Sequence, residues 1–439
     1  MLPPDKMPVQ QRLPGEIIQR IALFIPECDT FFALLDVFAE EGIGVLDHYL
    51  DLQDLMSPSL LWPTLRFHKY ALPSSLVLHH IQCLSACVSK VQLPPNFNVQ
   101  AVCPYLAPSS FVINASSYKR GIEDEMLRQT LRLVSTWKQL RSLTFTHLSD
   151  WQVGLALEFL TLPNITSFEI SSTVFGEKRY CPDIAAHEFE WVVSWLNATP
   201  VRHFAIDYWK VSQENSHLIP RFYDAVANCR TLRTFSISNA ILHGWNEYNF
   251  QNPLSINHFQ LKNCQFDPTC LPTLFSGLQH SRTRHLSINN DVRESYLGVR
   301  GLRILLGALP LTNLTHLTVQ GAMLADRGCF ALAEVLPSLN LTYLDISDNH
   351  ISDFGVNPLA QVLPSVVRLH ELVMKHNFLR MRGIVALILD LRQNSLEKTN
   401  LSDVQLAFDR CSRPEYVIKV DYGKTGTGAL LEKSPSGDA

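Results

Sequence analysis

The sequence predicts an α/β solenoid, in which one strand and one helix alternate in short repeats along the chain. The main observation is the pattern apolar-x-x-apolar-x-apolar, which occurs nine times within the 439 residues. The last three copies begin at Leu314, Leu341 and Leu369, so the repeats there are 27 and 28 residues long. Between the copies, apolar residues recur with the period of a helix. A fixed period of this size is typical of repeat proteins.

Each motif predicts a short strand, because its fourth and sixth positions alternate with polar residues and therefore point to one side of a sheet. Six rougher copies precede the three clean ones and begin at Leu140, Ile165, Val201, Leu232, Ile256 and Thr283. Two weaker candidates, at 88–93 and 111–113, extend the array toward the N-terminus.

A turn is expected eight residues after each motif begins. Asn349 and Asn377 occupy this position in the last two repeats. A buried Asn there can bond the backbone of the neighbouring turn and satisfy groups that the turn leaves unpaired. Cys264 and Thr173 hold the equivalent place in earlier repeats, where we expect a less regular array.

The segments between the strands predict helices. Amphipathic stretches lie at 188–196, 218–229, 324–336, 353–363 and 383–391. Their apolar stripes are expected to pack against the sheet. Pro310, Pro337 and Pro364 each follow such a stretch and mark the end of a helix.

A strand and a helix in about 28 residues resemble the ribonuclease-inhibitor-type leucine-rich repeat over residues 85–395. The resemblance implies a parallel sheet on the concave side and helices on the convex side. Because each repeat leans on its neighbours, such an array needs a cap at each end. Residues 1–84 and 396–422 are expected to form these caps, and the polar tail 423–439 is expected to be mobile.

The N-terminal segment contains a second informative motif. Pro14 begins an apolar helix, Pro26 ends it, and a second apolar helix follows. The segment is similar to the start of an F-box through Leu13, Pro14, Glu16, Ile17, Ile21, Ile25 and Pro26. This resemblance implies a helical segment within residues 1–84 that binds a Skp-type adaptor through Leu13, Pro14, Ile17 and Ile21. The alternative is a helical cap that binds no adaptor.

The polar positions of the repeated motif carry a recurring set of side chains. The third position holds His203, His258, His285, His316 and Tyr343. On a parallel sheet such neighbours lie about 4.8 Å apart, so the last three histidines are expected to stack side by side. The second position holds Arg202, Arg233 and Arg284. These eight residues are the predicted partner-binding set.

Three interpretations of this polar face remain open. It is a solvated surface, a surface for an acidic or phosphorylated protein whose binding weakens as pH rises through the His pKa, or a metal site. A straight ladder of imidazoles diverges, so no metal site is assigned to it.

Composition and motifs exclude several classes of function. The net charge of −4 argues against a nucleic-acid partner. The ten cysteines are scattered without a C-x-x-C pair, which is typical of an intracellular protein with reduced thiols. No secretory signal, membrane span or catalytic motif is recognised. We therefore expect a chain without enzymatic activity or cofactor, located in the cytoplasm or nucleus and not in a membrane.

The sequence as a whole predicts a non-catalytic protein-binding module. An F-box-like segment ahead of leucine-rich repeats implies the substrate-recognition subunit of a cullin-type ubiquitin ligase, with an unknown target on the concave face. The alternative is a leucine-rich-repeat interaction scaffold with no role in ubiquitin transfer.

Overall fold

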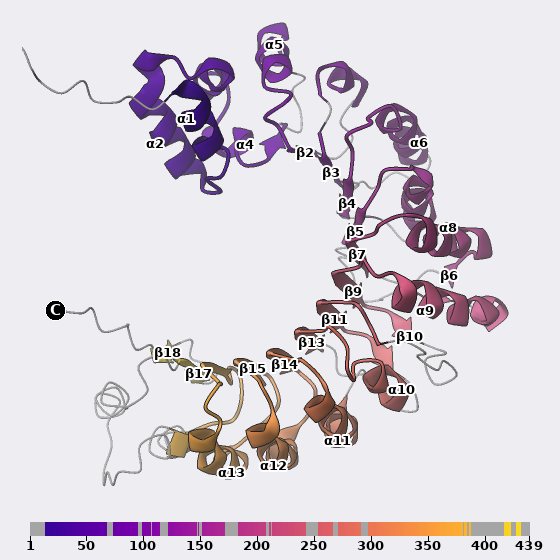
Figure 1. The fold of residues 1–439 in the computed structure, drawn as a ribbon, viewed down its shortest axis with the longest axis vertical. Helices are drawn as coiled ribbons and strands as arrows, with labels where there is room; N and C mark the ends of the chain where they lie inside the picture. Colours follow the sequence, from indigo (N-terminus) through magenta and orange to yellow (C-terminus); the bar gives the residue numbers. More distant parts are fainter. Residues whose placement is uncertain are drawn as a thin grey trace, which may run out of the picture. The chain divides into compact units, whose positions relative to one another are not determined.

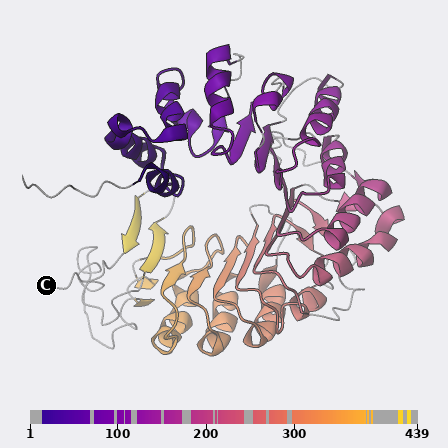
Figure 2. The same cartoon turned by 45° about the horizontal axis from the view of Figure 1, so that its top comes forward.

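The protein is described from a computed structural model, drawn in Figures 1 and 2 with colours that follow the sequence. It divides into two compact units, Met1–Val174 (unit 1) and Phe175–Ala439 (unit 2). The described residues are 14–67, 73–94, 99–106, 108–114, 122–146, 148, 152–171, 183–207, 210–211, 213–242, 253–266, 271–290, 297–380, 382–383, 386–387, 417–422 and 427–431. Thr173 and most of the helix predicted at 383–391 lie outside them.

Unit 1 begins with a group of helices around an aromatic core. The helices are α1 (Gly15–Ala22), α2 (Cys28–Phe38), α3 (Asp47–Gln53), α4 (Pro58–Leu61) and α5 (Ser75–Cys83). Phe31 stacks on Trp62 with ring centroids 4.1 Å apart, and Tyr49 packs edge-on against both. The indole N–H of Trp62 also donates to the carbonyl of Ile25 at 2.7 Å. Because these residues come from different parts of the segment, their contacts hold α2, α3 and α4 together.

The helical group leads into a parallel sheet in unit 1. Its strands are β1 (Leu65–Arg66), β2 (Lys90–Leu93), β3 (Ser110–Asn114), β4 (Ser142–Thr146) and β5 (Ser167–Ser171), each paired with the next. Helices α6 (Ile122–Val134) and α7 (Val153–Glu158) connect the later strands. Strands β2 and β3 confirm the two weaker motifs. The sequence does not predict β1, because two residues are too few to show a period, so the sheet already begins within residues 1–84.

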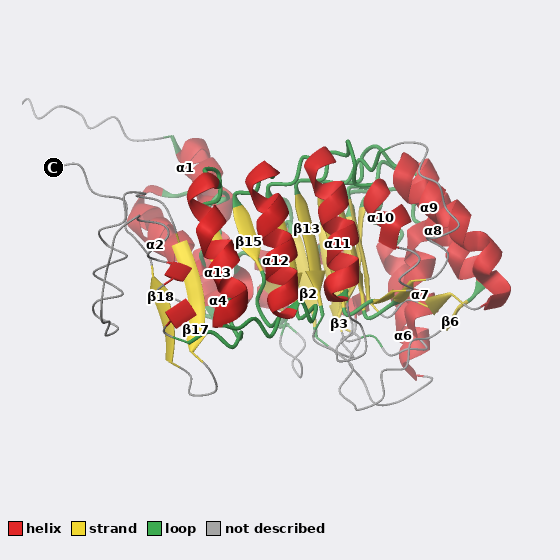
Figure 3. Ribbon diagram, turned by 90° about the horizontal axis from the view of Figure 1, so that it is seen from below, coloured by secondary structure: helices red, strands yellow, loops and turns green. Residues whose placement is uncertain are grey.

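Unit 2 repeats the pattern of strand and helix with greater regularity. Its main parallel strands are β7 (His203–Asp207), β9 (Thr234–Ser238), β11 (His258–Lys262), β13 (His285–Asn289), β14 (His316–Gln320), β15 (Tyr343–Asp345) and β16 (Glu371–Val373). Its helices are α8 (Ala186–Ala198), α9 (Ile219–Asn228), α10 (Leu271–Ser276), α11 (Gly298–Ala308), α12 (Ala325–Val335) and α13 (Asp353–Val362). Within this unit the strands line the inner side of the curve and the helices its outer side (Figures 1 and 3). The predicted α/β class is confirmed: the fold is a leucine-rich-repeat-like solenoid.

A small second sheet accompanies the main one in unit 2. It contains β6 (Asp183–Ile184), β8 (Lys210–Val211), β10 (Ile241–Leu242) and β12 (Gln265–Phe266), in the order β12-β10-β8-β6. Strands β8, β10 and β12 each follow a main strand by a few residues, and all four strands are too short to show a period in the sequence.

The C-terminal part of unit 2 adds two strands to the main sheet. Strand β17 (Val417–Tyr422) pairs in parallel with β16, and β18 (Thr427–Leu431) pairs antiparallel with β17. The predicted boundary between cap and tail, at residue 422, falls at the end of β17, and β18 lies within the predicted tail 423–439.

Aligned apolar residues form the core of unit 2. The fourth motif position falls in register across the sheet, so Phe204, Phe235 and Phe259 lie on adjacent strands. Their rings stack with centroids 5.9 and 5.6 Å apart, and all three are buried. Leucines 286, 317, 344 and 372 continue this column through the later strands. Burial of each such side chain stabilises the fold by about 1.5–3 kcal/mol.

Two buried asparagines connect consecutive turns, as the sequence predicts. The side-chain oxygen of Asn349 accepts from the backbone N–H groups of Ala322 and Leu324 at 2.9 and 3.4 Å. Its amide nitrogen donates to the carbonyl of Val319 at 2.6 Å. Asn377 accepts in the same way from the N–H groups of Asn349 and Ile351, one repeat further on. Each turn is thereby bonded to the preceding one through groups that would otherwise be buried and unpaired.

The equivalent position in an earlier repeat is held by Cys264. Its thiol is buried and donates to the carbonyl of Ile237 at 3.4 Å. A thiol is a weak donor and a weak acceptor, so Cys264 makes weaker hydrogen bonds at this position than the amide of an Asn.

Replacing Asn349 with Ala should lower the free energy of unfolding by about 2–4 kcal/mol, because two buried backbone N–H groups lose their acceptor. Asn357→Ala, on the exposed side of α13, is the matched control and should change stability by less than about 0.5 kcal/mol. Chemical denaturation of both variants checks this. Equal stability of the two variants would contradict the role of the buried amide.

Candidate functional site

The outer side of α1 presents apolar side chains to solvent. Ile17, Ile21 and Phe24 follow one another at intervals of four and three residues, so they lie on one face of the helix and of the turn that follows. They are 43%, 46% and 87% exposed. The opposite side of α1 is buried through Ile18 and Ala22. Helix α1 therefore has two apolar sides: one packs in the interior of unit 1 and the other is exposed to solvent.

The predicted adaptor-binding residues map onto this outer face. Pro14 is exposed and directly precedes α1, and its carbonyl accepts from the N–H groups of Ile17 and Ile18. Leu13 lies outside the described residues. Phe24 is not among the predicted adaptor-binding residues, but its spacing from Ile17 and Ile21 in the sequence indicates that it shares their face. We call Pro14, Ile17, Ile21 and Phe24 the apolar stripe.

The third motif position forms a stack of rings on the inner side of unit 2. The imidazoles of His258 and His285 have centroids 4.1 Å apart, and those of His285 and His316 are 4.0 Å apart. The phenol ring of Tyr343 continues the stack at 5.6 Å from His316. The angles between neighbouring ring planes are 19–25°. We call these four residues the ring ladder, and its stacking confirms the order predicted from the repeat.

The backbone register explains the ring ladder. His258 pairs with His285, His285 with His316, and His316 with Tyr343 across strands β11, β13, β14 and β15. Alternation along each strand turns these side chains away from the buried column at the fourth position. The hydroxyl of Thr315 lies 2.9 Å from Nδ1 of His316 and helps to orient that ring.

The remaining predicted residues lie around the ring ladder and not within it. His203 pairs with Thr234, which in turn pairs with His258, so one threonine separates His203 from the stack. Arg202, Arg233 and Arg284 are exposed and precede β7, β9 and β13.

Stacking changes the electrostatics expected of the ladder. Burial, followed by the nearby His316, His258 and Arg284, lowers the pKa of His285 to about 4. Burial also lowers the pKa of His316. Both rings are therefore neutral at pH 7. Partner binding that depends on their protonation should accordingly be lost at a lower pH than the ordinary His pKa predicts. At pH 7 the exposed Arg202, Arg233 and Arg284 keep permanent positive charge beside the ladder.

The far end of the ladder is acidic. The hydroxyl of Tyr343 lies 3.5 Å from Oδ2 of Asp345. Burial, with the neighbouring Asp345 and Glu371, raises the pKa of Tyr343 to about 12. Asp345 and Glu371, on β15 and β16, thus place two carboxylates beside the last ring of the ladder.

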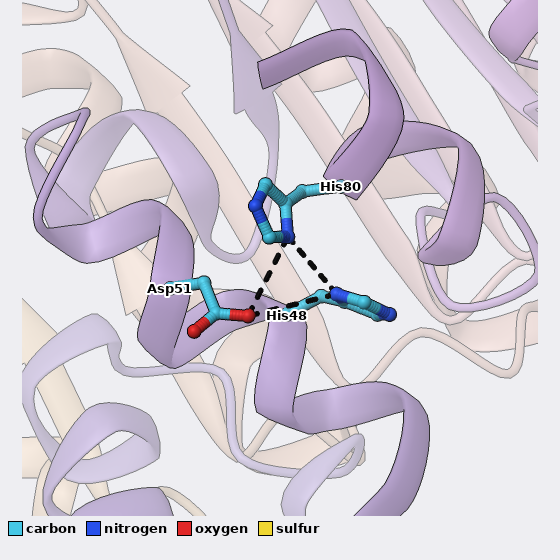
Figure 4. A group of neighbouring side chains, drawn as sticks. All are labelled: His48, Asp51 and His80. Atoms are coloured by element: carbon cyan, nitrogen blue, oxygen red, sulfur yellow. Dashed lines mark hydrogen bonds and ion pairs between the residues drawn. The ribbon is translucent and has the colours of Figure 1, made fainter. Parts of the chain in front are cut away.

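A convergence of ligand-type side chains lies elsewhere, in unit 1. Among the described residues, His48, Asp51 and His80 place one ligand atom each within 4.8 Å of one another (Figure 4). The ring ladder does not converge in this way, because its rings stack face to face. The sequence predicts no metal site here: the three-residue spacing of His48 and Asp51 is its only signal, and His80 comes from a different helix.

Comparisons with known proteins give little further information. No family model matches the sequence, and no curated protein is significantly similar to it. A crystal structure of a protein from Bacteroides fragilis aligns with a TM-score of 0.36 at 14% identity, covering 64% of this chain and 84% of that chain. A likeness this weak carries no argument, so the fold rests on the repeat spacing and the strand pairing. None of the helices in the described part is long and apolar enough to cross a bilayer.

The lowered pKa of His285 predicts a pH-dependent stability. Below about pH 6.5 the unfolded chain binds a proton at this residue, whereas the folded chain does so only near pH 4. Stability should therefore fall as the pH drops from 6.5 to 4, and His285→Gln should reduce this fall. Denaturant unfolding at pH 7.5 and 5.0 measures it, with the exposed His217→Gln as control. An unchanged pH dependence in His285→Gln would contradict the assignment.

Proposed function

We propose that this protein is a non-catalytic substrate-recognition subunit of a cullin-type ubiquitin ligase. In this role α1 docks a Skp-type adaptor, and the inner side of the solenoid holds the target. The observation that carries the proposal is the apolar stripe, which is exposed in a helix whose other side is already buried. The role places the protein in the cytoplasm or nucleus.

The stripe has the form of a helix that binds in a groove. Such helices present anchors at positions i, i+4 and i+7, which is the spacing of Ile17, Ile21 and Phe24. Burial of apolar surface in an interface contributes about 25 cal/mol per Å² to the free energy of binding. Three exposed apolar side chains in one row therefore favour a protein-binding role for α1. Glu16 and Arg20 on the same helix are exposed and supply a polar rim.

The resemblance to the start of an F-box favours the Skp-type adaptor as that partner. Pro14 and Ile17 belong to the motif and to the exposed stripe, so the residues that carry the likeness are free to make contact. A cap alone does not require this exposure, because the buried side of α1 would serve it equally well.

The inner side of unit 2 supports the second half of the proposal. Solenoids bind partners along extended concave surfaces. The ring ladder offers flat aromatic and imidazole faces, and Arg202, Arg233 and Arg284 offer guanidinium groups to one side of it. This combination suits an acidic or phosphorylated segment of a target protein.

Adaptor binding is expected to depend on the apolar stripe. The purified chain should retain a purified Skp-type adaptor, and Ile17→Glu combined with Ile21→Glu should weaken that binding at least about tenfold, because central apolar anchors dominate such interfaces. Phe354→Glu is the matched control, since Phe354 is an exposed apolar residue on α13 of unit 2. Calorimetric titration measures the affinities. Absence of binding by the unmodified chain would favour the interaction scaffold without a ubiquitin role.

Target binding is expected to depend on the ring ladder. Replacing His258, His285 and His316 together with Gln removes the ring faces while keeping polar side chains. Quantitative mass spectrometry of proteins bound in cells should show loss of the target, whereas His187→Gln with His217→Gln, away from the ladder, should leave recovery unchanged. Unchanged recovery with the triple variant would exclude the ladder as the target surface.

A further inference from the structure

His48, Asp51 and His80 bring three metal-ligand groups to one point in the N-terminal helices (Figure 4). The two Nδ1 atoms are 2.9 Å apart. Oδ2 of Asp51 lies 3.7 Å from Nδ1 of His48 and 3.5 Å from Nδ1 of His80. We propose that these three side chains bind one Zn²⁺ ion that joins α3 to α5.

The two helices place the three groups without distortion. His48 and Asp51 are three residues apart on α3, so they project from one side of that helix. His80 lies on α5 between Val77 and Ile81, which are both buried, so it belongs to the inward side of α5. The side chain of His80 is 12% exposed and that of His48 28%, whereas that of Asp51 is 57% exposed. The site is therefore held by packed helices and remains open to solvent on the aspartate side.

The distances agree with those around a zinc ion. Zinc binds imidazole nitrogen at about 2.0–2.1 Å and carboxylate oxygen at about 2.0–2.2 Å, in tetrahedral geometry. Two ligand atoms on such a tetrahedron are then about 3.3–3.5 Å apart. The three observed separations of 2.9, 3.5 and 3.7 Å lie on both sides of this value, so small side-chain movements bring all three atoms onto one ion.

Hydrogen bonding alone explains only part of this arrangement. One N–H···N bond between the imidazoles accounts for the 2.9 Å contact. It leaves the carboxylate oxygen of Asp51 at similar distances from both nitrogens, beyond the range of a good hydrogen bond to either. Neither α3 nor α5 contains a Lys or Arg that would pair with this carboxylate. A cation between the three atoms satisfies all of them at once.

The donor set favours zinc over harder cations. Two imidazole nitrogens and one carboxylate oxygen suit Zn²⁺, whereas Ca²⁺ and Mg²⁺ prefer ligands that are all oxygen. Three protein ligands leave a fourth position for water. The ion would cross-link two helices that lie next to the beginning of the sheet, where a repeat array needs a stable cap.

Zinc binding can be measured on the full chain after removal of metals with a chelator. Titration calorimetry with ZnCl₂ should show one site, and the metal should raise the melting temperature. Asp51→Asn is the most informative variant, because its side chain is exposed and nearly isosteric, so the fold is preserved. It should weaken zinc binding at least about 10- to 100-fold, the loss that even a supporting contact to a ligand produces. His80→Gln should weaken it at least as much.

Two matched variants test whether the ligands are correctly assigned. Asp54→Asn changes a carboxylate directly after the same helix, and His187→Gln changes an exposed histidine of unit 2; both should bind zinc like the unmodified chain. With Co²⁺ in place of zinc, visible absorption of a tetrahedral site is expected without a thiolate charge-transfer band. Absence of zinc binding, unchanged binding in Asp51→Asn, or a thiolate band from nearby cysteines would each overturn the proposal. Adaptor binding is measured separately, so neither result decides the other.

Discussion

The residue-by-residue register of the parallel strands is the constraint on which the rest of unit 2 depends. It aligns the fourth motif position into the buried column of Phe204, Phe235 and Phe259, and it aligns the third position into the ring ladder on the opposite side of the sheet. A shift of one residue would exchange the two sides. Asn349 and Asn377 protect this register, because each bonds one turn to the turn before it through buried backbone groups. The same strand pairing thus produces both the buried core on one side of the sheet and the candidate binding surface on the other.

The two ends of the array are built differently from the repeats between them. At one end of the sheet α4 contacts β1, and at the other end the antiparallel hairpin of β17 and β18 forms the last two strands. The N-terminal group contains more than a cap needs. Its first helix keeps apolar residues exposed, and α3 and α5 bring two imidazoles and a carboxylate together. The proposed adaptor surface on α1 and the proposed metal site between α3 and α5 use different helices of this group, so neither proposal requires the other.

The electrostatics of the ring ladder depend on packing and not on composition. Three histidines in a row suggest a cationic surface in the sequence. In the structure the rings stack at 4.0–4.1 Å, and burial is the main cause that lowers the pKa of His285 and of His316. At neutral pH these two residues therefore offer neutral ring faces and hydrogen-bonding nitrogens, while Arg202, Arg233 and Arg284 beside the ladder remain charged.

The sequence by itself determined the repeat, the strand positions, the buried asparagines and the order of the ring ladder. These features repeat at a nearly constant interval, and a parallel sheet converts that interval directly into contact. Only the tertiary structure decided the short strand β1, the pairing of β18, the exposed side of α1, the lowered pKa of His285, and the meeting of His48 and Asp51 with His80. Each of these depends on a single contact between elements, on the burial of a particular face, or on a separation of 32 residues that no period marks. A contact that occurs only once leaves no periodic signal in the sequence, so it becomes visible only in the folded structure.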